Sequence, residues 1–271
     1  MKTCFNTITA GLDRRLEDII AACAKSRFDG MEIDLRAIEE AAPRVSPKEI
    51  KQRLADGGLA AVSVMAFDLA PFATDDVAYE RFKRGAATAQ ELGAPILLTY
   101  CFAAIPEGMT RDAALDVAGK RAALYAKAAG PVKIALEPIG RTQLMGGPTA
   151  ALDIARRSGN AKVGIMMDTF HYYLSQVPDA DILSIPLDKL FIVHVNDSED
   201  RPIAELKDAH RMHVGAGILP LDHDFELIKR VGYDGFLSVE IFREEYWKQP
   251  VNQVVADAKA SLDRWLAKKG N

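Results

Sequence analysis

The sequence predicts a single (β/α)8 barrel domain over residues 1–271, on three observations. The chain has 271 residues, close to the ~250 that are typical of this fold. Eight short apolar runs alternate with longer segments of helical character, and eight parallel strands are the number that closes such a barrel. No low-complexity stretch or linker marks a second domain. A doubly wound open sheet is the alternative fold.

The eight apolar runs are the predicted strands. Each contains β-branched or large apolar residues, and most are nearly continuous in apolar character, as expected of parallel strands that are covered on both faces. The predicted strands are 3–8, 30–35, 60–67, 95–101, 132–139, 163–168, 190–196 and 236–242.

The intervening segments are predicted helices. Leu16, Ile19, Ile20 and Cys23 recur at helical spacing, and Ser46-Pro47 supplies an N-cap followed by a proline in the first turn. Residues 111–129 are rich in alanine, although Gly119 costs a helix about 1 kcal/mol relative to alanine. Residues 251–269 form the predicted last helix. The longest irregular stretch, 196–220, separates the last two strands, and long loops are often functional.

Composition narrows the class of protein. Hydrophobic residues make up 49% of the chain and charged residues 27%, which is typical of a globular protein. The net charge of −4 offers no basic excess to bind nucleic acid or an anionic membrane, so neither is expected as a partner.

The cysteines and the N-terminal segment predict a cytoplasmic protein. Cys4, Cys23 and Cys101 are odd in number and form no CxxC pair, which favours buried free thiols in a reducing compartment. The N-terminus lacks the apolar core of a signal peptide, and no apolar run reaches the roughly 18 residues of a membrane span.

Four consecutive predicted strands each end on a side chain that can bind a metal. These residues are Glu137, Asp168, His194 and Glu240. In a parallel barrel the carboxyl ends of all strands meet at one rim, where the active sites of this fold lie. Three carboxylates that converge without a cation would repel one another, and burying them unpaired is costly. One divalent ion resolves this conflict, and the mixed donor set suits Mn²⁺, Mg²⁺, Co²⁺ or Zn²⁺.

These segments carry a family resemblance over essentially the whole chain. The chain resembles the sugar phosphate isomerase/epimerase superfamily of xylose isomerase-like barrels in Glu137-Pro138, Asp168-Thr169-Phe170-His171, His194-Val195-Asn196-Asp197, Gly215-Ala216-Gly217 and Ser238-Val239-Glu240. Within it, the chain most resembles the inosose (2-keto-myo-inositol) isomerases, in its first six residues and in 132–137, 197–203 and 238–246.

The resemblance implies a role for each of several residues. Glu137 and Glu240 match the two glutamates that bind the metal and also move the proton next to a carbonyl, through an enediolate. His171 and Arg211 match residues that contact oxygen atoms of the substrate. Which glutamate is the base stays open.

Weaker candidates come from their position in the predicted strands. Glu32 on the second strand and Asn6 on the first are predicted to contact substrate if they point inward. His210, His213 and His223 are predicted to lie at the surface, and Phe102 to pack rather than to line the site.

The predicted function is therefore a metal-dependent isomerase of a small polyol or sugar ketone, here 2-keto-myo-inositol. A ketose 3-epimerase, a hydroxypyruvate isomerase and a 3-dehydroshikimate dehydratase would share the metal site and remain alternatives. A non-catalytic sugar-binding barrel is disfavoured because both glutamates are present. An endonuclease IV-like phosphodiesterase is disfavoured because the third and fourth strands end without histidine. Assembly into a homo-oligomer stays open.

Overall fold

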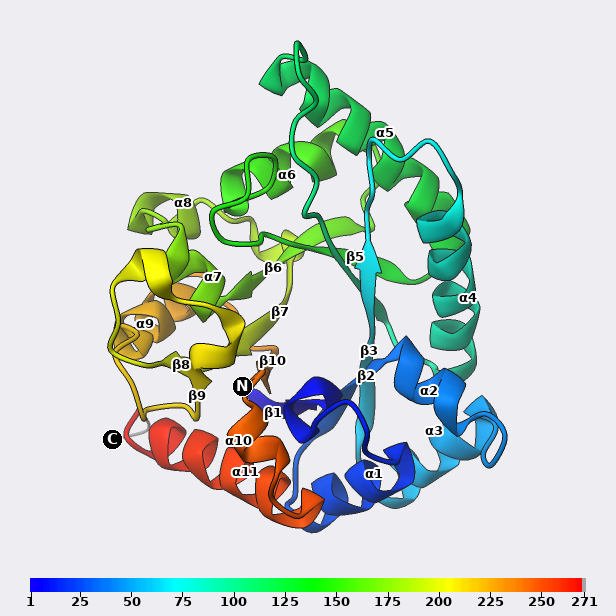
Figure 1. Cartoon of the computed structure of the whole chain (residues 1–271), viewed down its shortest axis with the longest axis vertical. Coiled ribbons are helices and arrows are strands. Elements are labelled where there is room, and N and C mark those ends of the chain that lie inside the picture. Colours follow the sequence, from blue (N-terminus) through cyan, green and yellow to red (C-terminus); the bar gives the residue numbers. More distant parts are fainter. Residues whose placement is uncertain (270–271) are drawn as a thin grey trace.

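The computed structural model describes residues 1–269 and forms a closed barrel of eight parallel strands inside a ring of helices (Figure 1). The strands are β1 (Lys2–Asn6), β2 (Gly30–Asp34), β3 (Ala60–Asp68), β4 (Ile96–Tyr100), β5 (Lys133–Glu137), β6 (Val163–Asp168), β7 (Leu190–Val195) and β10 (Phe236–Val239). Strand β1 pairs with both β2 and β10, which closes the sheet. The predicted barrel is confirmed, and the open sheet is wrong.

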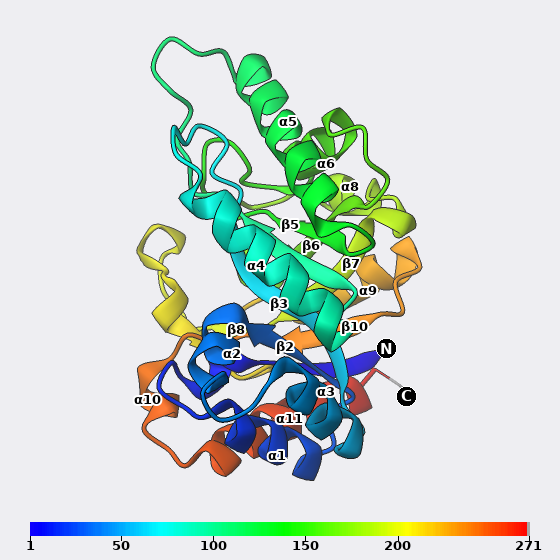
Figure 2. The ribbon, with the colours of Figure 1, turned by 90° about the vertical axis from the view of Figure 1, so that its right-hand side faces the viewer.

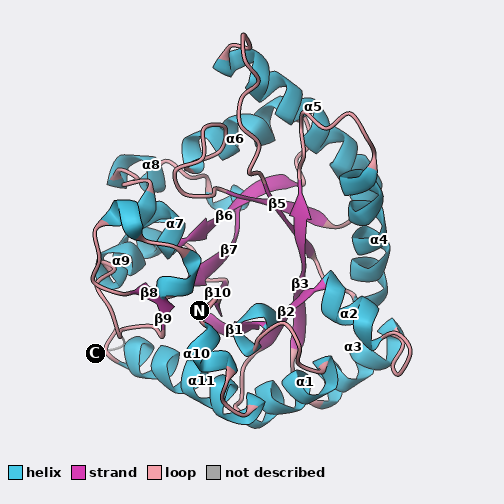
Figure 3. Cartoon of the chain, in the orientation of Figure 1, coloured by secondary structure: helices cyan, strands magenta, loops and turns pink. Residues whose placement is uncertain are grey.

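Helices cover the outer surface of the sheet (Figure 3). The helices of residues 1–269 are α1 (Leu16–Lys25), α2 (Leu35–Ala41), α3 (Pro47–Asp56), α4 (Val77–Leu92), α5 (Arg111–Ala129), α6 (Pro148–Arg157), α7 (Thr169–Leu174), α8 (Asp179–Leu183), α9 (Leu221–Val231), α10 (Glu244–Trp247) and α11 (Val251–Ala267), of which α10 lies beyond one end of the sheet. Gly119 lies inside α5, where a β-carbon would come 2.5 Å from Cβ of Arg157 on α6. Close approach of two helices therefore explains the glycine.

Alternation along the strands separates two apolar cores. Ile134 and Leu136 belong to the large core between strands and helices. Ala135 belongs to a second, smaller core with residues of neighbouring strands, Met166 and Ile192 among them. Since successive side chains of a strand point to opposite faces, this smaller core fills the barrel interior.

The two ends of the barrel differ. The N-terminus and the C-terminal end of α11 lie at one end, whereas α10 and the segment 196–220 project at the other (Figure 2). The predicted irregular stretch contains two short antiparallel strands, β8 (Asp197–Ser198) and β9 (Arg211–Met212). It also contains the 3-10 turns Ile203–Glu205 and Asp208–His210. The pairing of β8 with β9 and the two 3-10 turns thus order the segment 196–220.

The packing of α4 on the barrel yields a stability prediction. A β-carbon at Gly85 would come 2.0 Å from Cζ of Phe67, which is fully buried. We expect Gly85→Ala to lower the free energy of unfolding by about 1–3 kcal/mol, because overpacking outweighs the gain in helix propensity. Urea titration measures this difference. Ala87→Gln, at an exposed position of the same helix, should change stability by less than about 0.5 kcal/mol. Equal stability of Gly85→Ala and wild type would contradict the packing argument.

All three cysteines are buried free thiols, as predicted. Burial raises the pKa of Cys101 to about 11. Across residues 1–269, no helix combines the length and the apolar character needed to cross a bilayer.

Candidate metal and active site

The four predicted metal ligands converge at the carboxyl end of the barrel. Glu137 shares strand parity with Ala135, so it points into the barrel rather than toward the helices. The same parity holds for Asp168 after Met166 and for His194 after Ile192. Each of the four residues offers one ligand atom, and these atoms lie within 4.8 Å of one another. All four side chains are buried.

His194 is oriented by a carboxylate behind it. Its Nε2 lies 2.7 Å from Oε1 of Glu32, and both side chains are fully buried. A proton shared with Glu32 on Nε2 leaves Nδ1 to face the cluster, 3.2 Å from Oε2 of Glu240 and 3.6 Å from Oδ2 of Asp168. A histidine that donates one ring nitrogen to a carboxylate and presents the other is the usual arrangement of a metal ligand.

The two carboxylate oxygens of Asp168 have different roles: one caps a helix, and the other belongs to the candidate metal site. Oδ1 accepts hydrogen bonds from the backbone N–H groups of Phe170 (2.8 Å) and His171 (3.1 Å) and so caps α7. Oδ2 faces the cluster and accepts a hydrogen bond from Nη1 of Arg211 at 2.8 Å. The spacing of Asp168 and His171 in the sequence is therefore the spacing of a helix cap.

Glu240 and Glu137 differ in how they are held. Oε1 of Glu240 accepts a hydrogen bond from Nδ2 of Asn6 (2.9 Å), and Oε2 accepts one from Nη1 of Arg211 (3.0 Å). Among the described residues, no group donates a hydrogen bond to the carboxylate of Glu137. Its Oε1 lies 3.9 Å from Nδ1 of His194 and 4.0 Å from Nε2 of His171. Glu137 is thus a buried carboxylate whose oxygens can still accept interactions from a bound ion or ligand.

The electrostatics of the cluster favour a cation. Burial and the nearby Glu240 carboxylate hold the pKa of Glu137 well above its usual range. Burial by itself would lower the pKa of His194, but Glu32 and Glu240 outweigh it and raise this pKa. The excess of negative charge acts in the same direction on both groups, adding to the effect of burial on Glu137 and opposing it on His194. Three carboxylates and one imidazole whose Nδ1 faces them therefore fit a single divalent ion.

Arg211 connects the metal ligands to the loop. It is 1% exposed, and its Nε and Nη2 donate to Oδ1 of Asp208 at 3.0 and 2.7 Å. Its Nη2 lies 3.0 Å from Nε2 of His171. Burial lowers the pKa of His171, so His171 is neutral and accepts from Arg211. The guanidinium also lies over the rings of Phe170 and Phe242.

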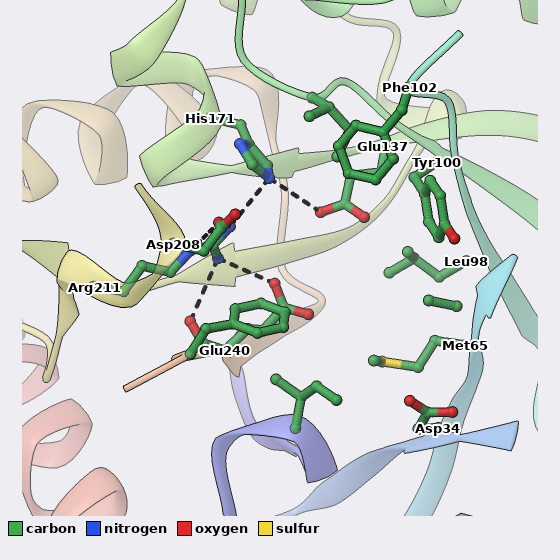
Figure 4. Close-up of a pocket in the computed structure, with 14 residues that line it drawn as sticks. Asp34, Met65, Leu98, Tyr100, Phe102, Glu137, His171, Asp208, Arg211 and Glu240 are labelled. Atoms are coloured by element: carbon green, nitrogen blue, oxygen red, sulfur yellow. Dashed lines mark hydrogen bonds and ion pairs between the residues drawn. The ribbon is translucent and has the colours of Figure 1, made fainter. Parts of the chain in front are cut away.

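A cavity of about 290 Å³ opens on the cluster. Glu137, His171, Arg211 and Glu240 line it on one side, and Met65, Leu98, Tyr100 and Asp34 lie opposite (Figure 4). The cavity is thus polar and charged on one wall and largely apolar on the other. Its size suits a small molecule.

Two predicted substrate contacts lie elsewhere. Glu32 and Asn6 point inward as expected, but neither lines the cavity. Each lies one layer deeper in the barrel, where Glu32 supports His194 and Asn6 supports Glu240. We therefore expect these two side chains to support the metal ligands rather than to touch the substrate. Strand parity alone gives a side chain's direction but not its depth.

The structure also adds cavity residues that the sequence did not single out. Asp34 ends β2 two residues after Glu32, with the same parity, and lines the cavity with Asp208. Phe102 lines it as well and is 63% exposed, so the expectation that it packs was wrong. The signal for Asp34 was its place at the strand end, directly before a helix.

His210, His213 and His223 lie outside the metal cluster described above. His223 is exposed and bonds to Asp179 at 2.9 Å. His210 and His213 are half-buried rather than fully exposed. His213 stacks on Tyr246, with ring centroids 4.2 Å apart.

A closed (β/α)8 barrel with a divalent-cation donor set at the carboxyl ends of its strands defines the general class of this protein. Residues 20–268 match the family described as xylose isomerase-like TIM barrel. The chain belongs to that family.

Individual relatives agree with this assignment. An inosose isomerase of Halalkalibacterium halodurans is 28% identical over 274 residues, which cover 96% of this chain and 94% of the relative. A 3-dehydroshikimate dehydratase of Pseudomonas putida is 26% identical over 94% of this chain, but this match covers 40% of the dehydratase. The crystal structure of the IolI protein with a zinc atom has a TM-score of 0.89, with 24% identity and 99% of both chains covered. This last likeness concerns the fold.

Proposed function

We propose that this enzyme, one of the isomerases and epimerases of its family, is a divalent-metal-dependent isomerase. It would shift a carbonyl group between neighbouring carbons of a small polyol ketone of the inosose type. One observation carries the proposal: Glu137 and Glu240 both line the cavity and both belong to the metal donor cluster. The 28% identity with an inosose isomerase over nearly the whole chain supports the choice of substrate.

Such a shift needs one group that removes a proton from the hydroxyl-bearing carbon and one that delivers a proton to the former carbonyl carbon. The hydroxyl proton moves to the former carbonyl oxygen, so the ketone and the hydroxyl exchange places. Glu137, Asp168, His194 and Glu240 would hold the metal ion. When bound, this ion supplies Lewis acidity that polarises the carbonyl and its neighbouring hydroxyl.

The protein groups supply the remaining steps. Hydrogen bonds from Asn6 and Arg211 keep the carboxylate of Glu240 in a fixed position beside the cavity. We assign Glu240 to proton removal for this reason. Glu137, which accepts no hydrogen bond within residues 1–269, is assigned to the delivery of a proton to the former carbonyl carbon. These two roles exchange in the reverse direction of the reaction.

Arg211 and His171 complete the charged wall. Arg211 is a fixed cation beside the reacting carbons, and a fixed cation stabilises the negative charge of an enediolate. His171 accepts from Arg211 and keeps the guanidinium turned toward the cavity. Asp208 holds the opposite edge of the same guanidinium.

Metal removal tests the proposal. We expect the chelator-treated enzyme to lose conversion of 2-keto-myo-inositol, and to regain it with Mn²⁺, Mg²⁺, Co²⁺ or Zn²⁺. Bound metal should also stabilise the fold, by about 2.7 kcal/mol at a hundredfold excess over Kd. NMR of the product and thermal unfolding with and without metal measure the two effects. Full activity of a metal-free enzyme would overturn the metal dependence, whereas loss of water from the substrate would indicate a dehydratase.

A further inference from the structure

Asp34 places a carboxylate on the otherwise largely apolar wall of the cavity. It ends β2 and lies opposite Arg211 and Glu240, near Met65 and Leu98 (Figure 4). Its side chain is 15% exposed. A buried carboxylate on an apolar wall is costly unless hydrogen-bond donors reach it.

The two oxygens of Asp34 have different surroundings. Oδ1 accepts a hydrogen bond from the backbone N–H of Arg36 at 2.7 Å and caps α2. The same oxygen lies 3.7 Å from Nη2 of Arg81, which does not line the cavity. Within residues 1–269, no group donates a hydrogen bond to Oδ2. Asp34 therefore presents one rigidly held oxygen with no protein donor.

Asp168 shows what this arrangement achieves. There too Oδ1 caps a helix, through the N–H of Phe170, and the other oxygen is left for the site. The cap holds the carboxylate in one orientation at the end of its strand. In Asp168 the remaining oxygen faces the metal cluster, and in Asp34 it remains available to a ligand on the opposite wall.

Charge limits what this ligand can be. Asp34, Asp208, Glu137 and Glu240 contribute carboxylates to the cavity lining, and Arg211 contributes the guanidinium. Arg211 is already paired with Asp208 and Glu240. A phosphate or carboxylate placed beside Asp34 would therefore meet a like charge in a partly desolvated cavity. A hydroxyl group, in contrast, would donate to the free oxygen.

We propose that Oδ2 of Asp34 accepts a hydrogen bond from a hydroxyl at the far end of the substrate, and that its charge excludes substrates anionic at that end. Asp34 is thus a specificity-determining residue that selects neutral polyol ketones. The proposal rests on the proposed function, which places the reacting carbonyl at Glu137 and Glu240.

The test compares Asp34→Asn with wild type in the metal-loaded enzyme. The amide oxygen can still cap α2, so the variant removes the charge and keeps the shape. We expect the KM for 2-keto-myo-inositol and the calorimetric Kd for myo-inositol to rise roughly ten- to hundredfold, the range of a hydrogen bond to a charged group. The kcat should change by only a fewfold. The ratio of the Kd for myo-inositol monophosphate to the Kd for myo-inositol should be lower in the variant than in wild type.

Asp68→Asn is the matched control. Asp68 ends β3, and its Oδ1 accepts from the N–H of Ala70 at 2.9 Å, but it does not line the cavity. This variant should bind both probes as wild type does, and thermal unfolding checks that both variants fold.

Unchanged binding of both probes by Asp34→Asn would overturn the proposal, as would equal effects of the two substitutions. Binding of myo-inositol does not require turnover. If wild type fails to convert the ketone, the proposed function falls while the binding comparison still decides the role of Asp34.

Discussion

Glu240→Gln is expected to lower kcat for 2-keto-myo-inositol by about 10²–10⁴-fold, the range that general acid–base groups contribute. The amide preserves the shape of the side chain and can still accept from Nδ2 of Asn6, which donates to Oε1 of Glu240 in wild type. It cannot take a proton from carbon. Incorporation of solvent deuterium into the substrate, followed by NMR, should therefore fall together with turnover.

The variant Glu137→Gln distinguishes the roles of the two glutamates. If Glu240 removes the proton and Glu137 delivers one to the former carbonyl carbon, deuterium exchange at the substrate carbon should survive better in Glu137→Gln than in Glu240→Gln. Glu107→Gln, at an exposed loop position, serves as the control and should retain wild-type kcat. Metal content must be measured for each variant, because both glutamates are also assigned as ligands. Full exchange and turnover in metal-loaded Glu240→Gln would sink its catalytic role.

The second large effect is expected at a residue that does not line the cavity. Glu32→Gln should weaken metal affinity by about 10–100-fold, the usual loss when the partner of a ligating histidine is changed. Glu32 lies 2.7 Å from Nε2 of His194 and orients Nδ1 toward the cluster. The amide can still hold the imidazole ring of His194 in place. It lacks the negative charge that makes His194 a stronger metal ligand.

Calorimetric titration of the metal-free protein with Mn²⁺ or Zn²⁺ measures this affinity directly. At saturating metal, Glu32→Gln should recover most of its kcat, since the side chain does not reach the cavity. A direct role of Glu32 in substrate binding would instead raise KM at saturating metal and leave the metal affinity unchanged. Glu107→Gln again provides the control for the substitution itself.

The metal cluster is where sequence reasoning and structure agree most closely in position. Apolar runs that end in a charged or imidazole side chain are informative because strands alternate strictly and parallel strands end at one rim. Counting back from Glu137 through Ala135 places the carboxylate inside the barrel. The same count applies to Asp168 and His194. Local order along each strand was enough to bring the four residues together.

Depth and loop conformation could not be obtained in this way. Glu32 and Asp34 have the same parity, and only the stagger of neighbouring strands decides that Glu32 reaches His194 while Asp34 reaches the cavity. Asp208 and Phe102 lie on loops, whose course depends on long-range contacts such as the pairing of Asp208 with Arg211.

The order of apolar and polar residues along the chain thus specified the barrel, its rim and the candidate metal ligands, because these follow from periodicities of two and of about 3.6 residues. Tertiary structure decided which inward-pointing side chains support the cluster and which line the cavity. It also decided that Asp34 lines the cavity with a carboxylate whose Oδ2 accepts no hydrogen bond from residues 1–269. Those outcomes depend on strand stagger and loop packing, which bring together residues far apart in the sequence.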